Sequence, residues 1–257
     1  MACMDDISGI LFDLDGVLFV GDRMIAGADT VVALVKQKQI PCRFITNTTT
    51  QSRDAIAQKL QGMGLSIQSR EIISTPSAAL LYLRQQGYRS CHLLVADEVK
   101  PEFEGIHESD LNPGAVVIGD IGSAWNYELL NKVFGMLMNG ADLIALHKNK
   151  FWQTDEGLRM DIGAFVAGLE YVTGKQAAVI GKPSPAFFEL AIRQLELPAA
   201  RVVMIGDDID SDVGGAQRAG LKGALVRTGK YRPEYAAASP IRPDYIFDSV
   251  ADMLGIF

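Results

Sequence analysis

Short apolar runs alternate along the chain with longer segments of helical periodicity. Each run is short and continuously apolar, as burial of a strand on both faces of a sheet requires. Five such runs predict strands at residues 10–14, 42–45, 202–205, 223–226 and 245–247. Their alternation with helical patterns predicts an α/β fold with a doubly wound, Rossmann-like parallel sheet covered by helices on both faces.

Capping residues mark the starts of two helices that follow these strands. Ser52 precedes a predicted helix over 53–60, and Ser184 precedes one that has Pro185 at its first position and extends to 195. Gly62 and Gly220 are suited to end helices, because glycine adopts the left-handed conformation at little cost.

A second set of elements occupies the middle of the chain. Helices are predicted at 76–86, 128–139 and 162–172, and strands at 92–96, 115–119 and 143–147. A segment of roughly a hundred residues is long enough to hold a core of its own. We therefore expect a catalytic sheet domain formed by residues 1–74 and 178–257, and an inserted α/β domain formed by residues 75–177.

Composition and charge narrow the possible partners. Hydrophobic residues make up 48% and charged residues 21% of the 257 positions, which is typical of a packed protein. The net charge of −7 would repel nucleic acid and anionic lipid, so we expect neither as a partner. Cys3, Cys42 and Cys91 form no pair with metal-site or redox spacing, and the chain shows no signal-peptide or membrane-spanning pattern. These features predict a reducing, cytoplasmic location.

The first apolar run leads into two carboxylates, Asp13 and Asp15, separated by one residue. Strand alternation would place both on the same side, where their charges repel one another. A bound Mg²⁺ ion or a shared catalytic task would offset that repulsion. Two solvated acids at a strand end are the alternative interpretation.

Other strand ends also carry polar residues, and the carboxyl ends of parallel strands form the usual ligand crevice of such sheets. An acid, a hydroxyl and a lysine placed there provide what phosphoryl transfer needs: a nucleophile, a metal clamp and a neutralising cation. The residues concerned are Thr46, Asn47, Lys182, Asp207, Asp208 and Asp212.

Taken singly, each of these residues has an ordinary structural explanation. Thr46 and Asn47 could be turn residues. Asp207 and Asp208 could be helix N-caps, and Lys182 could be a solvated loop charge. Their joint placement at strand ends is what favours a functional site.

Four motifs in order resemble those of the haloacid dehalogenase superfamily of phosphohydrolases: DLDGV at 13–17, TN at 46–47, GKP at 181–183 and GDDIDSD at 206–212. The insertion between the second and third motifs is similar to subfamily IIA with its C2-type cap, which includes p-nitrophenyl phosphatases. HKNKFW at 147–152 and MIGDDIDSDVGGAQ at 204–217 resemble the branch that contains phospholysine phosphohistidine inorganic pyrophosphate phosphatase. The resemblance covers nearly the whole chain.

The resemblance implies a Mg²⁺-dependent phosphatase that forms an aspartyl phosphate on Asp13. Asp15 would act as the general acid and then the general base. The Mg²⁺ ion would be held by the Asp13 carboxylate, the Asp15 backbone carbonyl and the Asp207 carboxylate. Because an alkoxide leaving group needs a proton, the presence of Asp15 favours ordinary phosphomonoesters. Pyrophosphate and the phosphoramidates phospholysine and phosphohistidine stay open as substrates.

Phosphate binding is implied for Thr46, Asn47 and Lys182, together with Asp15. Asp212 would support the metal ligands or Lys182 from behind, and Asp208 is a further candidate for such a supporting role.

The inserted domain would act as a cap that covers the substrate and selects it. A solvated strand end is the alternative for the candidate specificity residues, which are His147, Lys148, Lys150, Trp152 and Arg159. Residues 16–21 would form a flap beside the nucleophile, or a plain hairpin. The subfamily also suggests a homodimer formed through the cap.

Three rival functions share parts of this pattern. A receiver-like regulatory domain also combines acids, Thr and Lys around Mg²⁺, but it needs neither Asp15 nor a large insertion. A nucleotide-binding oxidoreductase would need a G-x-G-x-x-G turn after the first strand, which the chain lacks. A dehalogenase that attacks carbon would have no use for Asp15 or a metal-binding Asp207.

Overall fold

The computed structural model describes residues 6–154 and 157–255, and its internal contacts divide the chain into two compact units. The first unit contains Met1–Thr46, Arg53–Ile73 and Lys182–Phe257. The second contains Asn47–Ser52 and Ser74–Gly181. The short segment Asn47–Ser52, which the sequence places in the sheet domain, is therefore grouped with the inserted residues.

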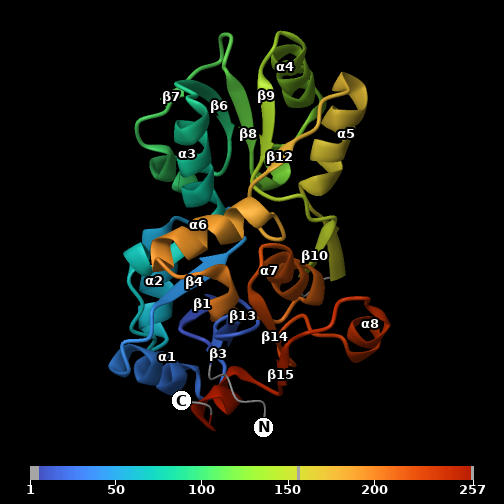
Figure 1. Ribbon diagram of the computed structural model, residues 1–257. Helices are drawn as coiled ribbons and strands as arrows, with labels where there is room; N and C mark the ends of the chain where they lie inside the picture. Colours follow the sequence, from blue (N-terminus) through green and yellow to red (C-terminus); the bar gives the residue numbers. More distant parts are fainter. Residues whose placement is uncertain (1–5, 155–156, 256–257) are drawn as a thin grey trace. The chain divides into compact units, whose positions relative to one another are not determined.

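The first unit contains a six-stranded sheet in the order β15-β14-β13-β1-β4-β5 (Figure 1). Its strands are β1 (Gly9–Asp13), β4 (Cys42–Thr46), β5 (Ile72–Ser74), β13 (Val202–Gly206), β14 (Lys222–Val226) and β15 (Tyr245–Phe247). β1 pairs in parallel with β4 on one side and β13 on the other. The five predicted strands are confirmed, and the strand order reverses direction at β1, which places a topological switch point there.

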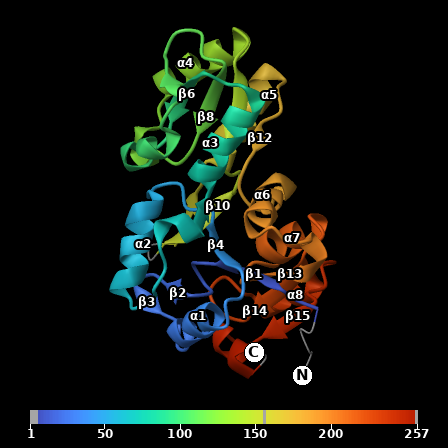
Figure 2. The same ribbon diagram turned by 60° about the vertical axis from the view of Figure 1, so that its left-hand side comes forward.

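Helices cover this sheet on both faces, as the doubly wound prediction requires (Figure 2). Ile10 and Phe12 of β1 belong to a core that also contains buried residues of α1 (Ala28–Gln37), α2 (Arg53–Gly62) and η6 (Val250–Gly255). Leu11 lies between them and points to the opposite face. Two further helices, α6 (Pro185–Leu195) and α7 (Gly215–Arg218), pack together and contact β4 and β14.

The second unit contains a five-stranded sheet in the order β12-β9-β8-β6-β7. Its strands are β6 (Ser90–Leu94), β7 (His107–Glu108), β8 (Ala115–Ile118), β9 (Asp142–Ala145) and β12 (Ala178–Val179). Its helices are α3 (Thr75–Gln86), α4 (Tyr127–Met138) and α5 (Gly163–Thr173). Val133 of α4 and Val166 of α5 share a core with Val116 of β8, so this unit has its own hydrophobic centre.

Several elements were not anticipated from the sequence. α1 follows Gly27, which has a φ of 81° and provides no side-chain cap, so the usual N-cap signal is missing. The hairpin of β10 (Phe151–Thr154) and β11 (Gly157–Met160) was also not anticipated. The hairpin of β2 (Phe19–Val20) and β3 (Arg23–Met24) begins within residues 16–21, for which a flap or a plain hairpin was predicted. The remaining helices are η1 (Ser69–Glu71), η2 (Asp97–Phe103), η3 (Gly122–Ala124), η4 (Ala199–Arg201), η5 (Ile209–Gly214) and α8 (Pro233–Ala238).

Two findings bear on the environment of the protein. Among the residues that the structure describes, no helix combines the length and the apolar character needed to cross a bilayer. Cys42 and Cys91 are buried free thiols, and Cys3 lies outside the described residues.

Candidate active site

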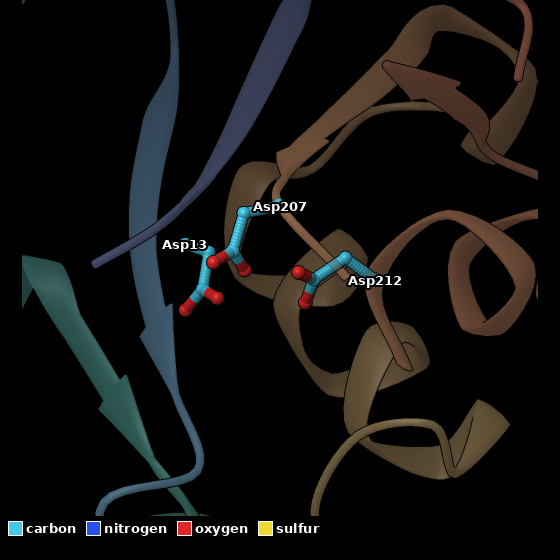
Figure 3. A group of neighbouring side chains, drawn as sticks. All are labelled: Asp13, Asp207 and Asp212. Carbon is cyan, nitrogen blue, oxygen red and sulfur yellow. The ribbon is translucent and has the colours of Figure 1, made fainter. Parts of the chain in front are cut away.

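Three buried carboxylates of the first unit converge at the carboxyl ends of β1 and β13 (Figure 3). Asp13 is the last residue of β1, Asp207 directly follows β13, and Asp212 lies in η5. One oxygen from each side chain lies within 4.8 Å of the others. Like charges this close are unfavourable unless a cation accompanies them, so the group could hold a divalent metal ion.

Lys182 supplies one cation to this group. Its Nζ lies 2.8 Å from Asp13 Oδ1 and 2.7 Å from Asp212 Oδ1, and its side chain is only 4% exposed. Burial opposes the ammonium charge, but Asp13 and Asp212 outweigh burial and raise the pKa of Lys182. Lys182 is therefore a fixed positive charge, and not a solvated loop residue.

Asp13 has one engaged oxygen and one that stays available. Its Oδ1 accepts a hydrogen bond from the Leu14 backbone N–H at 2.8 Å as well as the Lys182 contact. Among the described residues, Oδ2 has no hydrogen-bond or ion-pair partner. An oriented carboxylate with one oxygen available is suited to nucleophilic attack or to metal ligation.

Asp207, like Asp13, has one oxygen with a hydrogen-bond partner and one without. Oδ2 accepts a hydrogen bond from the Lys230 backbone N–H at 2.6 Å, whereas Oδ1 is buried and has no hydrogen-bond partner within the described part of the chain. Burial, followed by the nearby charge of Asp13, raises the pKa of Asp207 to about 7. A buried carboxylate oxygen without a donor fits a hard cation such as Mg²⁺.

Asp212 is differently placed, because both of its oxygens are engaged. Oδ1 contacts Lys182, and Oδ2 accepts a hydrogen bond from the Asp208 backbone N–H at 3.1 Å. Burial and the charge of Asp13 raise the pKa of Asp212, while Lys182 opposes that rise. Asp212 is therefore placed to position Lys182, and it differs from Asp13 and Asp207 in that both of its oxygens already have partners.

Asp208 serves the backbone in this structure. Its Oδ1 accepts hydrogen bonds from the Asp210 and Ser211 backbone N–H groups, both at 2.9 Å, so it is the N-cap of η5. This is the structural explanation that the sequence left open for Asp208.

Asp15 lies beyond the end of β1 and is exposed, whereas Asp13 is buried. The alternation of strand side chains therefore applies only as far as Asp13, and it does not determine where the Asp15 side chain lies. The partial burial of the Asp15 carboxylate raises its pKa, Lys230 opposes this rise, and Asp13 adds to it. The pair therefore consists of a buried carboxylate and a more exposed one that still senses its charge.

The loop after β14 is part of the site and was missed by the sequence analysis. Gly16 and Gly229 have φ values of 88° and 58°, and a Cβ on either would lie 1.9 Å or 2.1 Å from Asp207 Oδ2. Thr228 Oγ1 donates a hydrogen bond to the Gly16 carbonyl. The available signal was the Thr-Gly-Lys segment at 228–230, one residue after a predicted strand.

The TN motif is divided between the two units. Thr46 is the buried last residue of β4 in the first unit. Asn47 belongs to the second unit, where a Cβ on Gly181 would lie 2.6 Å from its Oδ1. The lack of a side chain at Gly181 thus makes room for the Asn47 carboxamide.

Two of the candidate specificity residues are held by neighbours within the second unit. His147 is buried, its Nδ1 accepts a hydrogen bond from the Asn149 backbone N–H at 3.4 Å, and its Nε2 lies 3.9 Å from Asp161 Oδ1. Lys148 Nζ lies 2.5 Å from Glu170 Oε2. His147 therefore has a buried setting that the solvated-strand alternative does not describe.

The other candidates lie on or beside the β10–β11 hairpin. Lys150 and Arg159 are exposed. Trp152 pairs with Arg159 in the backbone register, and its side chain lies outside the described part of the structure.

Comparisons with known proteins agree with this geometry. Residues 10–107 match the family profile described as haloacid dehalogenase-like hydrolase, and residues 179–253 match one described as HAD-hydrolase-like. The chain is 38% identical to phospholysine phosphohistidine inorganic pyrophosphate phosphatase of Bos taurus, over 97% of this chain and 94% of that one. It is 40% identical to haloacid dehalogenase-like hydrolase domain-containing protein 2 of Bos taurus, over 90% and 88%. The solved structure of 4-nitrophenylphosphatase from Thermotoga maritima superposes with a TM-score of 0.92 at 26% identity, and covers 99% of both chains.

Proposed function

The chain belongs to the haloacid dehalogenase-like hydrolase family, and on that premise we propose that it is a Mg²⁺-dependent phosphatase of small phosphorylated molecules. The proposed reaction passes through an aspartyl phosphate on Asp13. The observation that carries the proposal is the state of Asp13, whose Oδ1 is fixed by Leu14 and Lys182 while Oδ2 stays available beside Asp207.

In the first step, an Asp13 oxygen attacks phosphorus and the bond from phosphorus to the leaving oxygen breaks. The products of this step are an aspartyl phosphate and a free leaving group. Lys182 holds the Asp13 carboxylate in place by its 2.8 Å contact, and its ammonium offsets the negative charge of the phosphoryl oxygens.

Asp15 is proposed to supply the proton that the leaving oxygen takes up. The raised pKa of Asp15 helps it to keep that proton near neutral pH, which a general acid requires. Deprotonated Asp15 then accepts a proton from water as the water oxygen attacks phosphorus. The bond from phosphorus to Asp13 breaks, which releases phosphate and restores the free carboxylate.

A Mg²⁺ ion is proposed to bind to Asp13 and Asp207, together with the Asp15 backbone carbonyl. The oxygens that remain available on the two carboxylates support this assignment. When bound, the ion would supply positive charge against the phosphoryl oxygens. Thr46 and Asn47 are proposed to donate hydrogen bonds to the same phosphoryl group.

Substrate selection is proposed to lie with the second unit acting as a cap, through His147, Lys148, Lys150, Trp152 and Arg159. The relatives are named for phospholysine, phosphohistidine, inorganic pyrophosphate and 4-nitrophenyl phosphate. We place phosphomonoesters first for this chain, because Asp15 is available to protonate an alkoxide. Pyrophosphate and phosphoramidates are the within-class options.

The test is a phosphate-release screen with purified protein and Mg²⁺ over sugar phosphates, nucleotides, pyridoxal phosphate, pyrophosphate and phosphoamino acids. We expect multiple turnovers on at least one compound, and none with Asp13→Asn. A long-lived aspartyl phosphate without multiple turnover would instead favour the receiver-like alternative. Activity that survives EDTA would reopen metal-free chemistry.

A further inference from the structure

Lys230 is a second cation of the first unit that the proposed chemistry does not use. Its backbone N–H donates to Asp207 Oδ2 at 2.6 Å, and the preceding Gly229 is pressed so close to Gly16 that a Cβ there would lie 2.4 Å from Gly16 Cα. Thr228 is also hydrogen-bonded to the Gly16 carbonyl. The backbone on both sides of this lysine is therefore fixed against the Asp15–Gly16 turn.

Lys230 and Lys182 differ in what their ammonium groups do. Lys182 is buried and pairs with Asp13 and Asp212. Lys230 is exposed, and its ammonium makes no ion pair with any described residue. Burial opposes the ammonium charge, but Asp13 and Asp207 outweigh burial and raise the pKa of Lys230. Lys230 in turn lowers the pKa of Asp15.

The charge balance of the site shows why a second cation matters. Four carboxylates (Asp13, Asp15, Asp207 and Asp212) lie in or beside the site, and the Lys182 ammonium pairs with two of them, Asp13 and Asp212. With a divalent ion bound and all four ionised, the site would still carry one excess negative charge before a phosphate dianion arrived. Lys59 also lowers the pKa of Asp15, but its ammonium pairs with Asp22 Oδ1 at 3.1 Å. Lys230 is an exposed cation without an ion pair among the described residues, and it can offset this charge in a chain whose net charge of −7 repels anions.

We propose that the Lys230 ammonium binds a negatively charged group on the leaving-group side of the substrate, so that the enzyme favours phosphate compounds whose leaving group is itself anionic. The inference rests on the proposed function, because the leaving-group side is the side of Asp15. The loop that carries Lys230 lies against Gly16, the residue next to Asp15. Lys182 thus positions the Asp13 nucleophile, and Lys230 binds the leaving group.

The test compares two ligands that differ only in charge on the leaving group: 2-phosphoglycolate and its carboxamide. Their dissociation constants are measured by calorimetry with Mg²⁺ on the Asp13→Asn background, where bound compounds are not consumed. We expect the carboxylate to bind at least about tenfold more tightly than the carboxamide, as one charge-assisted contact allows. Adding Lys230→Met should remove most of that preference, and Lys230→Arg should restore part of it.

Lys222→Met is the matched control. It removes the same charge from the start of β14, where Lys222 pairs with Asp244 Oδ1 at 2.9 Å, and it should leave the preference unchanged. Equal affinity of the two ligands for the Asp13→Asn background, no binding of either, or an equal loss for both ligands in Lys230→Met would overturn the inference. The proposed function is tested by a separate measurement: it fails if the wild-type enzyme shows no multiple turnover in the phosphate-release screen.

Discussion

Gly229 leaves no space for a side chain beside Asp207, because a Cβ at this position would lie 2.1 Å from Asp207 Oδ2. The same Cβ would lie 2.4 Å from the backbone of Gly16, so the conflict cannot be relieved by a rotamer change alone. Gly229→Ala should therefore displace both the metal-ligand candidate and the turn after Asp13. We expect kcat/KM to fall about 10²-fold, the loss that a displacement of about 1 Å can cause.

Gly21→Ala is a matched control for that substitution. Gly21 has a φ of 59°, nearly the 58° of Gly229, but a Cβ there would meet nothing within 4 Å. Both variants should lose roughly 1–2 kcal/mol of stability from the left-handed backbone. Only Gly229→Ala should also show a lower kcat/KM. Equal kcat/KM values in the two variants would show that the close approach to Asp207 is unimportant.

Lys182→Ala tests the cation that holds Asp13. Removal of its charge should lower kcat by about 10²- to 10³-fold, or roughly 2–4 kcal/mol of transition-state stabilisation. Denaturant unfolding should also show a loss of about 3–5 kcal/mol, because Asp13 and Asp212 would remain buried without their partner. Asp212→Asn keeps the Lys182–Asp13 contact and should reduce kcat less. An undiminished kcat in Lys182→Ala would contradict the assigned role.

Metal binding can be measured without turnover. Mg²⁺ at 100 times its dissociation constant should stabilise the folded protein by about 2.7 kcal/mol, seen as a rise in Tm. Asp207→Asn should abolish this rise, because it replaces the carboxylate whose buried Oδ1 has no donor among the described residues. Asp208→Asn should keep it, since Asn also caps helices well and Asp208 acts here as the η5 N-cap. An unchanged Mg²⁺ response in Asp207→Asn would rule this ligand out.

The sequence was sufficient for the sheet and for most of the carboxylate site. Apolar runs that end in acids identify strands, and the carboxyl ends of neighbouring parallel strands must meet, so Asp13 and Asp207 could be brought together from pattern alone. The sequence could not show which oxygens of these two carboxylates are engaged, because that depends on which backbone N–H groups lie nearby. The Lys230 N–H that engages Asp207 Oδ2 comes from a loop 23 residues away in the chain.

Other features could not be predicted from the sequence because they depend on local packing and on where elements end. The sequence alone does not distinguish Gly229 and Lys230 from the residues of an ordinary turn. Their place in the site follows from the packing against Gly16 and the hydrogen bond to Asp207. Alternation implied that Asp13 and Asp15 share a face, but β1 ends at Asp13 and the rule stops applying there. Asp208 was open between capping and a supporting role in the site, and its two backbone donors show that it caps.

His92 in β6 should make the stability of the protein depend on pH. Burial and the nearby Lys132 charge lower the pKa of His92, and Asp110, at 2.9 Å, only partly offsets them. The unfolded chain therefore binds the proton first, so the free energy of unfolding should decrease as pH falls below about 6.5 towards the folded pKa. His92→Asn should flatten this decrease, whereas replacement of the exposed His107 by Asn should not. The same slope in both variants would contradict the assignment.

In the proposed mechanism Asp13 carries the phosphoryl group during turnover, and this intermediate can be observed directly. Asp15→Asn protein is mixed with Mg²⁺ and 4-nitrophenyl phosphate, whose leaving group departs without a proton. The mixture is quenched in acid, digested and examined by mass spectrometry. We predict a phosphoryl group on Asp13. It should accumulate because the water that would release it is no longer activated. The proposed intermediate would be contradicted if the wild-type enzyme turns over the substrate but Asp15→Asn shows no phosphorylated Asp13, and Asp13→Asn keeps full activity.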